Sequence, residues 1–272
     1  MRKGLIKMII DFHTHCFPDF LAEKTTEILR RRSGILRPAH SGTVASLLNT
    51  AKRAGVDHSV VLNIATNPHQ QTKVNDFAIS LLNTEGIIPF GSVHPESENA
   101  LSELDRLYDA GIRGIKFHPD YQGFYCDEDR MLPIYEKIGR LGFITVFHCG
   151  LDMGIPLPIH CSAKRLGEIL PSFSGAPVIA AHFGGFGDCE NVEKYLCGKD
   201  VYLDTAYCSG VLPPAAAKEI IAIHSADRIL MASDSPWNDP ADSIELIKFF
   251  ELSDEDEAKI LGENAARLLN IN

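Results

Sequence analysis

The chain has 272 residues, of which 45% are hydrophobic and 23% charged, and its formal net charge is −10. This composition is typical of a soluble globular protein, and the length suits one domain, residues 1–272, built as an eight-stranded α/β barrel. The acidic balance disfavours nucleic acid or an anionic membrane as a partner, because both bind basic surfaces. We therefore expect a small-molecule substrate, and a homodimer stays open as an assembly.

The N-terminal stretch and the cysteines indicate where the protein works. The apolar run after Met1 is broken by Lys7 and closed by Asp11, which is too short for the core of a signal peptide, and no stretch could span a bilayer. The seven cysteines include no Cys-x-x-Cys pair, as is typical of reduced thiols. Both patterns predict a cytoplasmic protein without a cysteine-rich zinc site.

Short strand-like runs alternate with helix-like runs along the chain. The strand-like runs cover residues 8–15, 59–65, 87–93, 112–117, 143–147, 177–181, 201–205 and 229–233. Helical spacing marks residues 70–83, residues 134–141 and a segment that carries Leu104 and is capped by Ser97. Residues 253–270 are expected to form two capped helices that close or flank the barrel.

This alternation indicates a parallel sheet buried on both faces, closed into a slightly distorted (β/α)8 TIM barrel. A doubly wound dinucleotide fold would carry a glycine-rich loop after its first strand, and here that loop contains Cys16, Phe17 and Pro18. The basic run that ends at Arg32 is expected to close a helix, where cations complement the helix dipole. A phosphate-binding role for this run is the alternative.

Four histidines and one aspartate end or directly follow strand-like runs: His13, His15, His148, His182 and Asp234. His13 and His15 lie two residues apart, so in a strand they share a face with Asp11. Two imidazoles on one edge can bind one metal ion, and the alternative is one packing histidine beside a solvated one. Because barrels collect functional groups at the C-terminal ends of their strands, the whole set predicts a functional site there.

Motifs along nearly the whole chain resemble those of the amidohydrolase superfamily, and more closely its amidohydrolase 2 branch. They are Asp11-Phe-His-Thr-His, Gly114-Ile-Lys-Phe-His-Pro, Val146-Phe-His-Cys-Gly, Ala181-His-Phe-Gly-Gly, Leu203-Asp-Thr, Ala232-Ser-Asp-Ser-Pro-Trp and Gly262-Glu-Asn-Ala-Ala-Arg-Leu-Leu. That branch contains aminocarboxymuconate semialdehyde decarboxylase, resorcylate decarboxylases, pyrone-dicarboxylate lactonase and many metal-dependent hydrolases. None of the motifs identifies a substrate.

The resemblance implies roles for the strand-end residues. The ligands of one divalent ion, usually zinc, with manganese or another divalent ion as alternatives, would be His13, His15, His148 and Asp234. Such a metal lowers the pKa of a bound water towards neutrality. Asp234 would then transfer the proton, and His182 would polarise the substrate carbonyl, stabilise the oxyanion or act as the acid/base.

Several further residues are expected near the pocket. In binuclear members of the superfamily, a lysine like Lys116 carries a carbamate that bridges two metals, but the branch resembled here usually holds one metal, which we favour. Lys116 would then be a buried salt-bridge partner, or a cation for a substrate carboxylate. The other expected substrate contacts are His118, Tyr121 and Trp237. The histidines expected at the surface are His40, His58, His69, His160 and His224.

These features predict a metal-dependent hydrolase that cleaves an amide, ester or lactone bond of a small polar molecule. The alternative is a non-oxidative decarboxylase, or a hydratase, that acts on a small and in some cases aromatic carboxylic acid at the same site. Decarboxylases need cations for acidic substrates, and few lie near strand ends, since Arg113 is early in its strand and Lys164 and Arg165 fall on a helix. This scarcity favours hydrolysis. A barrel that binds metal without turnover is the third interpretation.

Overall fold

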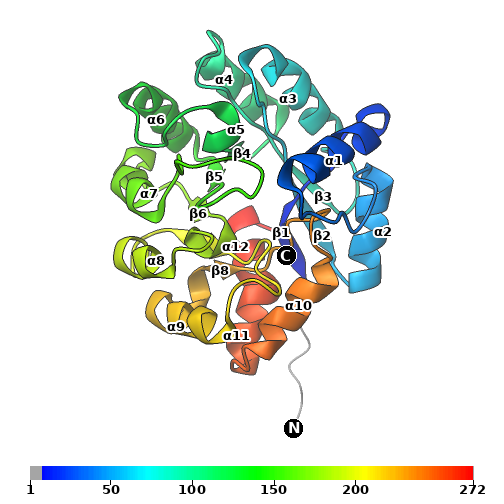
Figure 1. The fold of residues 1–272 in the computed structure, drawn as a ribbon. Helices are drawn as coiled ribbons and strands as arrows, with labels where there is room; N and C mark the ends of the chain where they lie inside the picture. The colour runs from blue at the N-terminus through cyan, green and yellow to red at the C-terminus, as the bar shows by residue number, and fades with distance from the viewer. Residues whose placement is uncertain (1–7, 272) are drawn as a thin grey trace.

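The computed structural model describes residues 8–271, so the interpretation of residues 1–7 concerns a stretch outside this range. Within it, parallel strands alternate with helices in the predicted order (Figure 1). The strands are β1 (Ile10–Thr14), β2 (His58–Leu62), β3 (Ile87–Phe90), β4 (Gly114–Phe117), β5 (Ile144–Phe147), β6 (Val178–Ala180), β7 (Tyr202–Asp204) and β8 (Ile229–Leu230). Each of them overlaps one of the predicted runs.

Most of the helices form a ring outside the strands, as Figure 1 shows. They are α1 (Asp19–Ser33), α2 (Val44–Ala54), α3 (Gln71–Ser80), α4 (Ala100–Ala110), α5 (Pro119–Gln122), α6 (Leu132–Leu141), α7 (Ala163–Ile169), α8 (Cys189–Tyr195), α9 (Pro214–His224), α10 (Pro240–Phe249), α11 (Asp254–Ala258) and α12 (Asn264–Leu269). The basic run does end a helix, because Arg32 lies in the last turn of α1. The predicted cap Ser97 is wrong, since α4 begins only at Ala100.

The strands close into a barrel through two weak seams. β1, β2 and β3 form one parallel sheet, and β4 to β8 form a second. A bridge between Gly91 and Ile115 joins β3 to β4, and a bridge between Thr14 and Ser235 joins β1 to the chain after β8. The strands therefore follow one another around a circle, as in the predicted TIM barrel. The barrel is distorted at these two seams, where single bridges replace regular strand pairing.

The pairing of β1 with β2 contains an irregularity that reorients β1. The register between β1 and β2 shifts by one residue between Asp11 and Thr14. Phe12 packs into the apolar interior of the barrel, whereas the Asp11 carboxylate accepts a hydrogen bond from Ser233 N at 2.9 Å. The prediction that Asp11 shares a face with His13 is therefore wrong, because a bulge lets a strand redirect one side chain. Burial raises the pKa of the Asp11 carboxyl to about 7.

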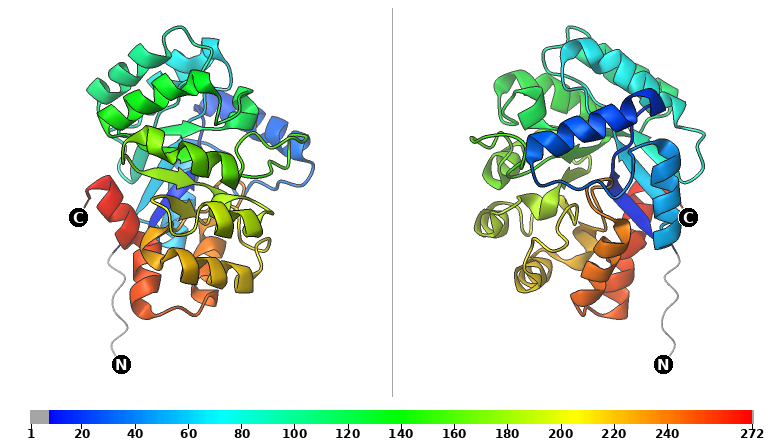
Figure 2. Two further views of the ribbon diagram at one scale, coloured as in Figure 1. Left: turned by 90° about the vertical axis from the view of Figure 1, so that its left-hand side faces the viewer. Right: turned by 45° about the vertical axis from the view of Figure 1, so that its right-hand side comes forward.

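The barrel interior is apolar except at the end that carries the strand-end histidines. Its buried members include Ile10, Phe12, Val60, Leu62, Phe90, Ile144, Val146, Ile179, Ala181, Leu230 and Ala265. Ala265 belongs to α12, which lies at one end of the barrel (Figure 2). The tail thus closes the barrel as expected. It is one continuous helical run rather than two separate helices, because a π-helical turn (Lys259–Glu263) connects α11 to α12.

A second apolar layer lies between the strands and the outer helices and fixes the strands that carry the site. Phe117 of β4 stacks on Phe147 of β5, with ring centres 5.2 Å apart, and Tyr135 of α6 packs on both rings. Burying each such ring stabilises the fold by ~1.5–3 kcal/mol. Lys116 and His148, which adjoin these residues in sequence, are therefore carried on rigid strands.

Two histidines that were expected at the surface are instead part of the fold. His224 is buried, and its Nε2 donates to Val201 O at 2.9 Å. His40 is partly buried between Ser46 Oγ and Ser235 Oγ, at 2.9 and 2.8 Å. Neither belongs to the strand-end cluster. In residues 8–271, no helix is both long and apolar enough to traverse a bilayer.

Candidate metal centre

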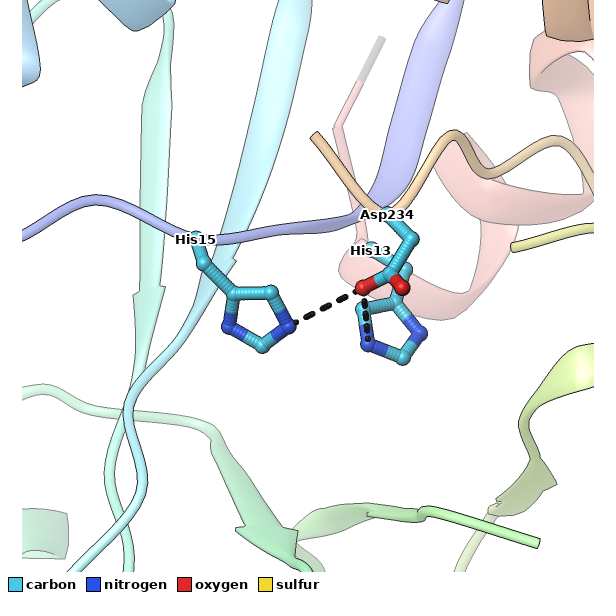
Figure 3. A group of neighbouring side chains, drawn as sticks. All are labelled: His13, His15 and Asp234. Atoms are coloured by element: carbon cyan, nitrogen blue, oxygen red, sulfur yellow. Dashed lines mark ion pairs between the residues drawn. The ribbon is translucent and has the colours of Figure 1, made fainter. Parts of the chain in front are cut away.

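His13, His15 and Asp234 converge at one end of the barrel (Figure 3). Asp234 Oδ1 lies 3.4 Å from His13 Nε2 and 3.2 Å from His15 Nε2. The seam between β1 and the chain after β8 brings the residues together, because Asp234 N donates to His13 O at 2.8 Å. Their ligand atoms lie within 4.8 Å of one another, which is close enough to share one ion.

Hydrogen bonds fix the tautomers of both imidazoles. His15 Nδ1 lies 2.9 Å from Leu62 O, and a carbonyl oxygen only accepts, so Nδ1 carries the hydrogen and Nε2 a lone pair. His13 Nδ1 donates in the same way to Asp204 Oδ2 at 2.9 Å. Both lone pairs therefore face a carboxylate oxygen. A cation among these acceptors would satisfy them, and the donor set suits a divalent metal.

His148 offers a third imidazole nitrogen with a lone pair available to a metal. His182 Nδ1 donates to Ala206 O at 2.9 Å, so its Nε2 accepts the hydrogen of His148 Nδ1, also at 2.9 Å. His148 Nε2 is then left with a lone pair, and it is buried without a partner among residues 8–271. An unpaired buried polar atom costs ~1–3 kcal/mol, which metal ligation would remove.

The predicted ligands form two neighbouring groups. His13, His15 and Asp234 form the first, and His148 lies in a second with His118 and Asp152, whose ligand atoms are also within 4.8 Å of one another. His182 lies between the groups, with its ring centre 5.4 Å from that of His13 and 4.6 Å from that of His148. Ligation of one shared ion by His148 therefore stays a prediction.

Asp204 is a part of the centre that the sequence analysis did not assign. Besides holding His13, its Oδ1 accepts from the backbone N–H groups of His182 and Ala206 at 2.9 and 3.0 Å. Burial raises the pKa of this carboxyl. A carboxylate that orients a ligating imidazole is a common supporting feature of metal sites. Its place at the end of β7 was the signal that could have identified it.

Lys116 lies at the floor of the site. Its Nζ is 3.3 Å from His13 Nε2, and burial lowers the pKa of the ammonium to about 8. Among residues 8–271 no carboxylate oxygen lies within 4.0 Å of it, so the predicted salt bridge is not found. It lines the cavity instead, beside His13.

Three residues around this site have backbone conformations that only glycine adopts easily. His182, Tyr207 and Asp234 have φ angles of 58°, 54° and 68°. A positive φ at such residues costs free energy and persists where the surroundings enforce it, most often at functional sites. Here it follows the ends of β6, β7 and β8 and directs all three side chains to the cavity.

The cavity above these residues has a volume of about 1050 Å³. The predicted substrate contacts His118, Tyr121 and Trp237 all line it. The sequence analysis missed two cations in its lining, Arg32 and Lys73. They lie on α1 and α3 rather than at strand ends, and α1 lies in front of the strands, inside the outer ring (Figure 1).

The walls between these polar residues are largely apolar or aromatic. They include Phe17, Phe20, Leu21, Ile28, Leu29, Phe77, Leu151, Phe186 and Tyr207. The polar part of the lining includes the strand-end residues, Arg32 at the end of α1 and Lys73 on α3. A largely apolar lining with a few polar groups is typical of small-molecule sites.

Comparison with known proteins supports this picture. A family model described as amidohydrolase matches residues 10–271, whereas no curated protein matches. Many solved structures share the fold, and three of them illustrate the likeness. An uncharacterised TIM-barrel protein from Bordetella bronchiseptica is 19% identical, with a TM-score of 0.76 over 97% of this chain and 98% of the other. A 5-carboxyvanillate decarboxylase from Sphingomonas paucimobilis is 15% identical, with a TM-score of 0.73 over 97% and 99%.

The third structure is a dihydroxybenzoic acid decarboxylase from Polaromonas sp. JS666, solved with manganese and the inhibitor 2-nitroresorcinol. It is 17% identical, with a TM-score of 0.72 over 97% of both chains. At these identities the likeness shows the fold. The family match covers the barrel from β1 to the tail and includes every residue of the candidate metal centre, so the chain belongs to the amidohydrolase family.

Proposed function

We propose that the protein is a metal-dependent decarboxylase that removes the carboxyl group of a small, planar carboxylic acid without oxidation. The observation that carries this proposal is Lys116, a buried cation with no acidic partner within 4.0 Å among the described residues, beside the ligand cluster and open to the cavity. An ammonium in this place attracts a carboxylate and holds it next to the metal ligands. Two of the structures with this fold are named as decarboxylases of aromatic acids.

The sequence analysis favoured hydrolysis because few cations were expected near the strand ends. The cations that line the cavity remove this argument. Arg113, Lys164 and Arg165 do lie outside the cavity, but Arg32 and Lys73 line it together with Lys116. The cavity therefore carries positive side chains in a protein whose formal net charge is −10. This contrast supports an acidic substrate.

The residues of the site can perform the steps that decarboxylation requires. A divalent ion, Mn²⁺ or Zn²⁺, would supply charge that orients and polarises the bound acid. Lys116 would hold the carboxylate, and Asp234 or His182 would deliver a proton to the carbon that bears it. The new C–H bond would form with a π electron pair of the substrate, and the bond between that carbon and the carboxyl group would then break, so that its electron pair restores the π bond and CO2 leaves.

Hydrolysis of a lactone, ester or amide is the second candidate. It is favoured by the Asp234 carboxylate, which lies beside two Nε2 lone pairs and lines the cavity, where it could accept a proton from a water. The same ligand set would serve both reactions. Only the products distinguish them.

A substrate panel in D2O tests the proposal. Protein loaded with Mn²⁺ or Zn²⁺ is incubated with hydroxybenzoates, aromatic dicarboxylates, lactones and esters, and CO2 release and deuterium incorporation are measured. We expect CO2 release, with one deuterium on the carbon that lost the carboxyl group, and loss of both in D234N. Cleavage of lactones or esters without CO2 would establish hydrolysis, and full metal loading without any turnover would support a silent metal-binding barrel.

A further inference from the structure

The protein engages both ring nitrogens and the backbone nitrogen of His118. The backbone N donates to Gln122 Oε1 at 2.9 Å, and the Gln122 amide in turn donates to Val93 O at 3.0 Å. The ring Nδ1 accepts from Tyr121 N at 3.4 Å, and the ring Nε2 lies 3.3 Å from Asp152 Oδ2. The side chain is therefore buried and fixed, although it lines the cavity.

These contacts leave His118 without a lone pair for a metal. Because a backbone N–H only donates, Nδ1 provides the lone pair of the neutral ring and Nε2 carries the hydrogen. That hydrogen faces the Asp152 carboxylate. In the group formed by His118, His148 and Asp152, only His148 has a ring nitrogen without a partner among residues 8–271.

The ring of His118 lies flat on the ring of His148. The two ring centres are 4.0 Å apart, and the angle between the planes is 12°. In the part of the chain that the structure describes, the His148 ring makes one hydrogen bond, from Nδ1 to His182 Nε2 at 2.9 Å. This bond restrains the position of Nδ1, whereas the flat neighbour restrains the plane of the ring. Together the two contacts fix the direction of the Nε2 lone pair.

We infer that His118 is a positioning residue of the metal centre, which holds the His148 ring so that its Nε2 faces the ion. His118 acts through the face of its ring and not through its nitrogens. This inference rests on the metal centre of the proposed function, but not on which reaction takes place there. It gives His118 a role besides the substrate contact predicted from the sequence.

Two apolar substitutions separate the flat face from the nitrogens. H118F keeps a flat ring, H118L fills a similar volume without one, and both lose the same polar contacts. Mn²⁺ affinity is measured by competition with a chelator, and the visible absorption of Co²⁺-loaded protein reports the geometry around the ion. We expect H118L to weaken Mn²⁺ binding about 10-fold and to shift the Co²⁺ bands, because the plane of His148 is no longer fixed. H118F should stay within about threefold of the wild type and keep its Co²⁺ spectrum.

H224L is the matched control for the loss of a buried histidine. His224 is also buried, and its two ring nitrogens bond Gly198 N at 3.2 Å and Val201 O at 2.9 Å, outside the metal centre. H224L should lower the free energy of unfolding, yet leave the Mn²⁺ affinity and the Co²⁺ spectrum unchanged.

The inference is overturned if H118L binds Mn²⁺ as tightly as the wild type, or if H118F loses as much affinity as H118L. Wild-type protein that binds no Mn²⁺ would overturn both this inference and the proposed function. Failure of the proposed function alone would look different: the variants would follow the expected pattern of Mn²⁺ binding, yet the substrate panel would release no CO2.

Discussion

Asp204 decides which nitrogen of His13 faces the cavity, because its carboxylate accepts the Nδ1 hydrogen. Asp204→Asn removes the charge that fixes this tautomer and makes Nε2 a better donor. We expect metal affinity to fall ~10–100-fold, as measured by competition with a chelator. Asp200→Asn is the control, since that carboxylate is 77% exposed and pairs with Arg228 outside the site. Equal affinities in the two variants would show that Asp204 does not support the ligand.

His182 can be separated from the metal ligands by substitution. Its Nε2 accepts from His148 Nδ1, and Gln keeps an acceptor at this place but cannot carry and release a proton. His182→Gln should therefore keep one equivalent of metal while turnover falls ~10²–10⁴-fold, the usual contribution of a general acid or base. Metal content is read by elemental analysis and turnover by CO2 release. Unchanged turnover would exclude His182 from proton transfer.

For single residues, the sequence predicted where the functional side chains lie better than how they are oriented. His13, His15 and Asp234 follow strands, and strands of a barrel end at one rim, so their convergence could be foreseen. The one-residue shift in β1 leaves no mark in the residue pattern, and Asp11 was therefore misplaced. Arg32 was missed because a helix end comes to lie over the cavity only through tertiary packing.

Helix α4 shows how burial divides one element into two faces. Leu104 is fully buried, whereas Leu101 on the same helix is 42% exposed. Leu104→Ala should lower the free energy of unfolding by ~2–5 kcal/mol through lost burial and a cavity, whereas Leu101→Ala should change it by at most about 0.5 kcal/mol. Urea unfolding followed by circular dichroism measures both. Similar values for the two variants would contradict the packing of α4.

The elements themselves could be predicted because barrel strands are buried on both faces and read as short apolar runs. The ends of these elements were harder to predict from the sequence. Serine is a common N-cap residue, which is why Ser97 was predicted to cap α4. Instead, the Ser97 carbonyl accepts a hydrogen bond from Ala100 N in a turn before α4 begins. The continuous tail depends on the π-helical turn before Asn264, whose amide donates to Ala226 O at 2.7 Å, a contact over a distance that no local pattern encodes.

For the whole molecule, His40 links stability to pH. It connects the loop before α2 to Ser235 beyond β8, and burial lowers its pKa from 6.5 to about 4, with Asp239 raising and Arg53 lowering it to lesser extents. The unfolded chain binds a proton on His40 more tightly than the folded protein does. The contribution of neutral His40 to the free energy of unfolding is therefore complete above pH 6.5 and is lost as the pH falls towards 4. His40→Asn should therefore lose less stability than the wild type between pH 7 and pH 5 in urea titrations. An equally steep loss in both proteins would contradict this role.

We predict that His13, His15, His148 and Asp234 hold one divalent ion at the mouth of the barrel. Anomalous diffraction from crystals of the Mn²⁺-loaded protein tests it directly, because the signal locates the ion independently of any activity. We expect a single anomalous peak within bonding distance of those three imidazoles and that carboxylate. A peak held by His118 and Asp152 instead, or no peak beside His13 and His15, would contradict it.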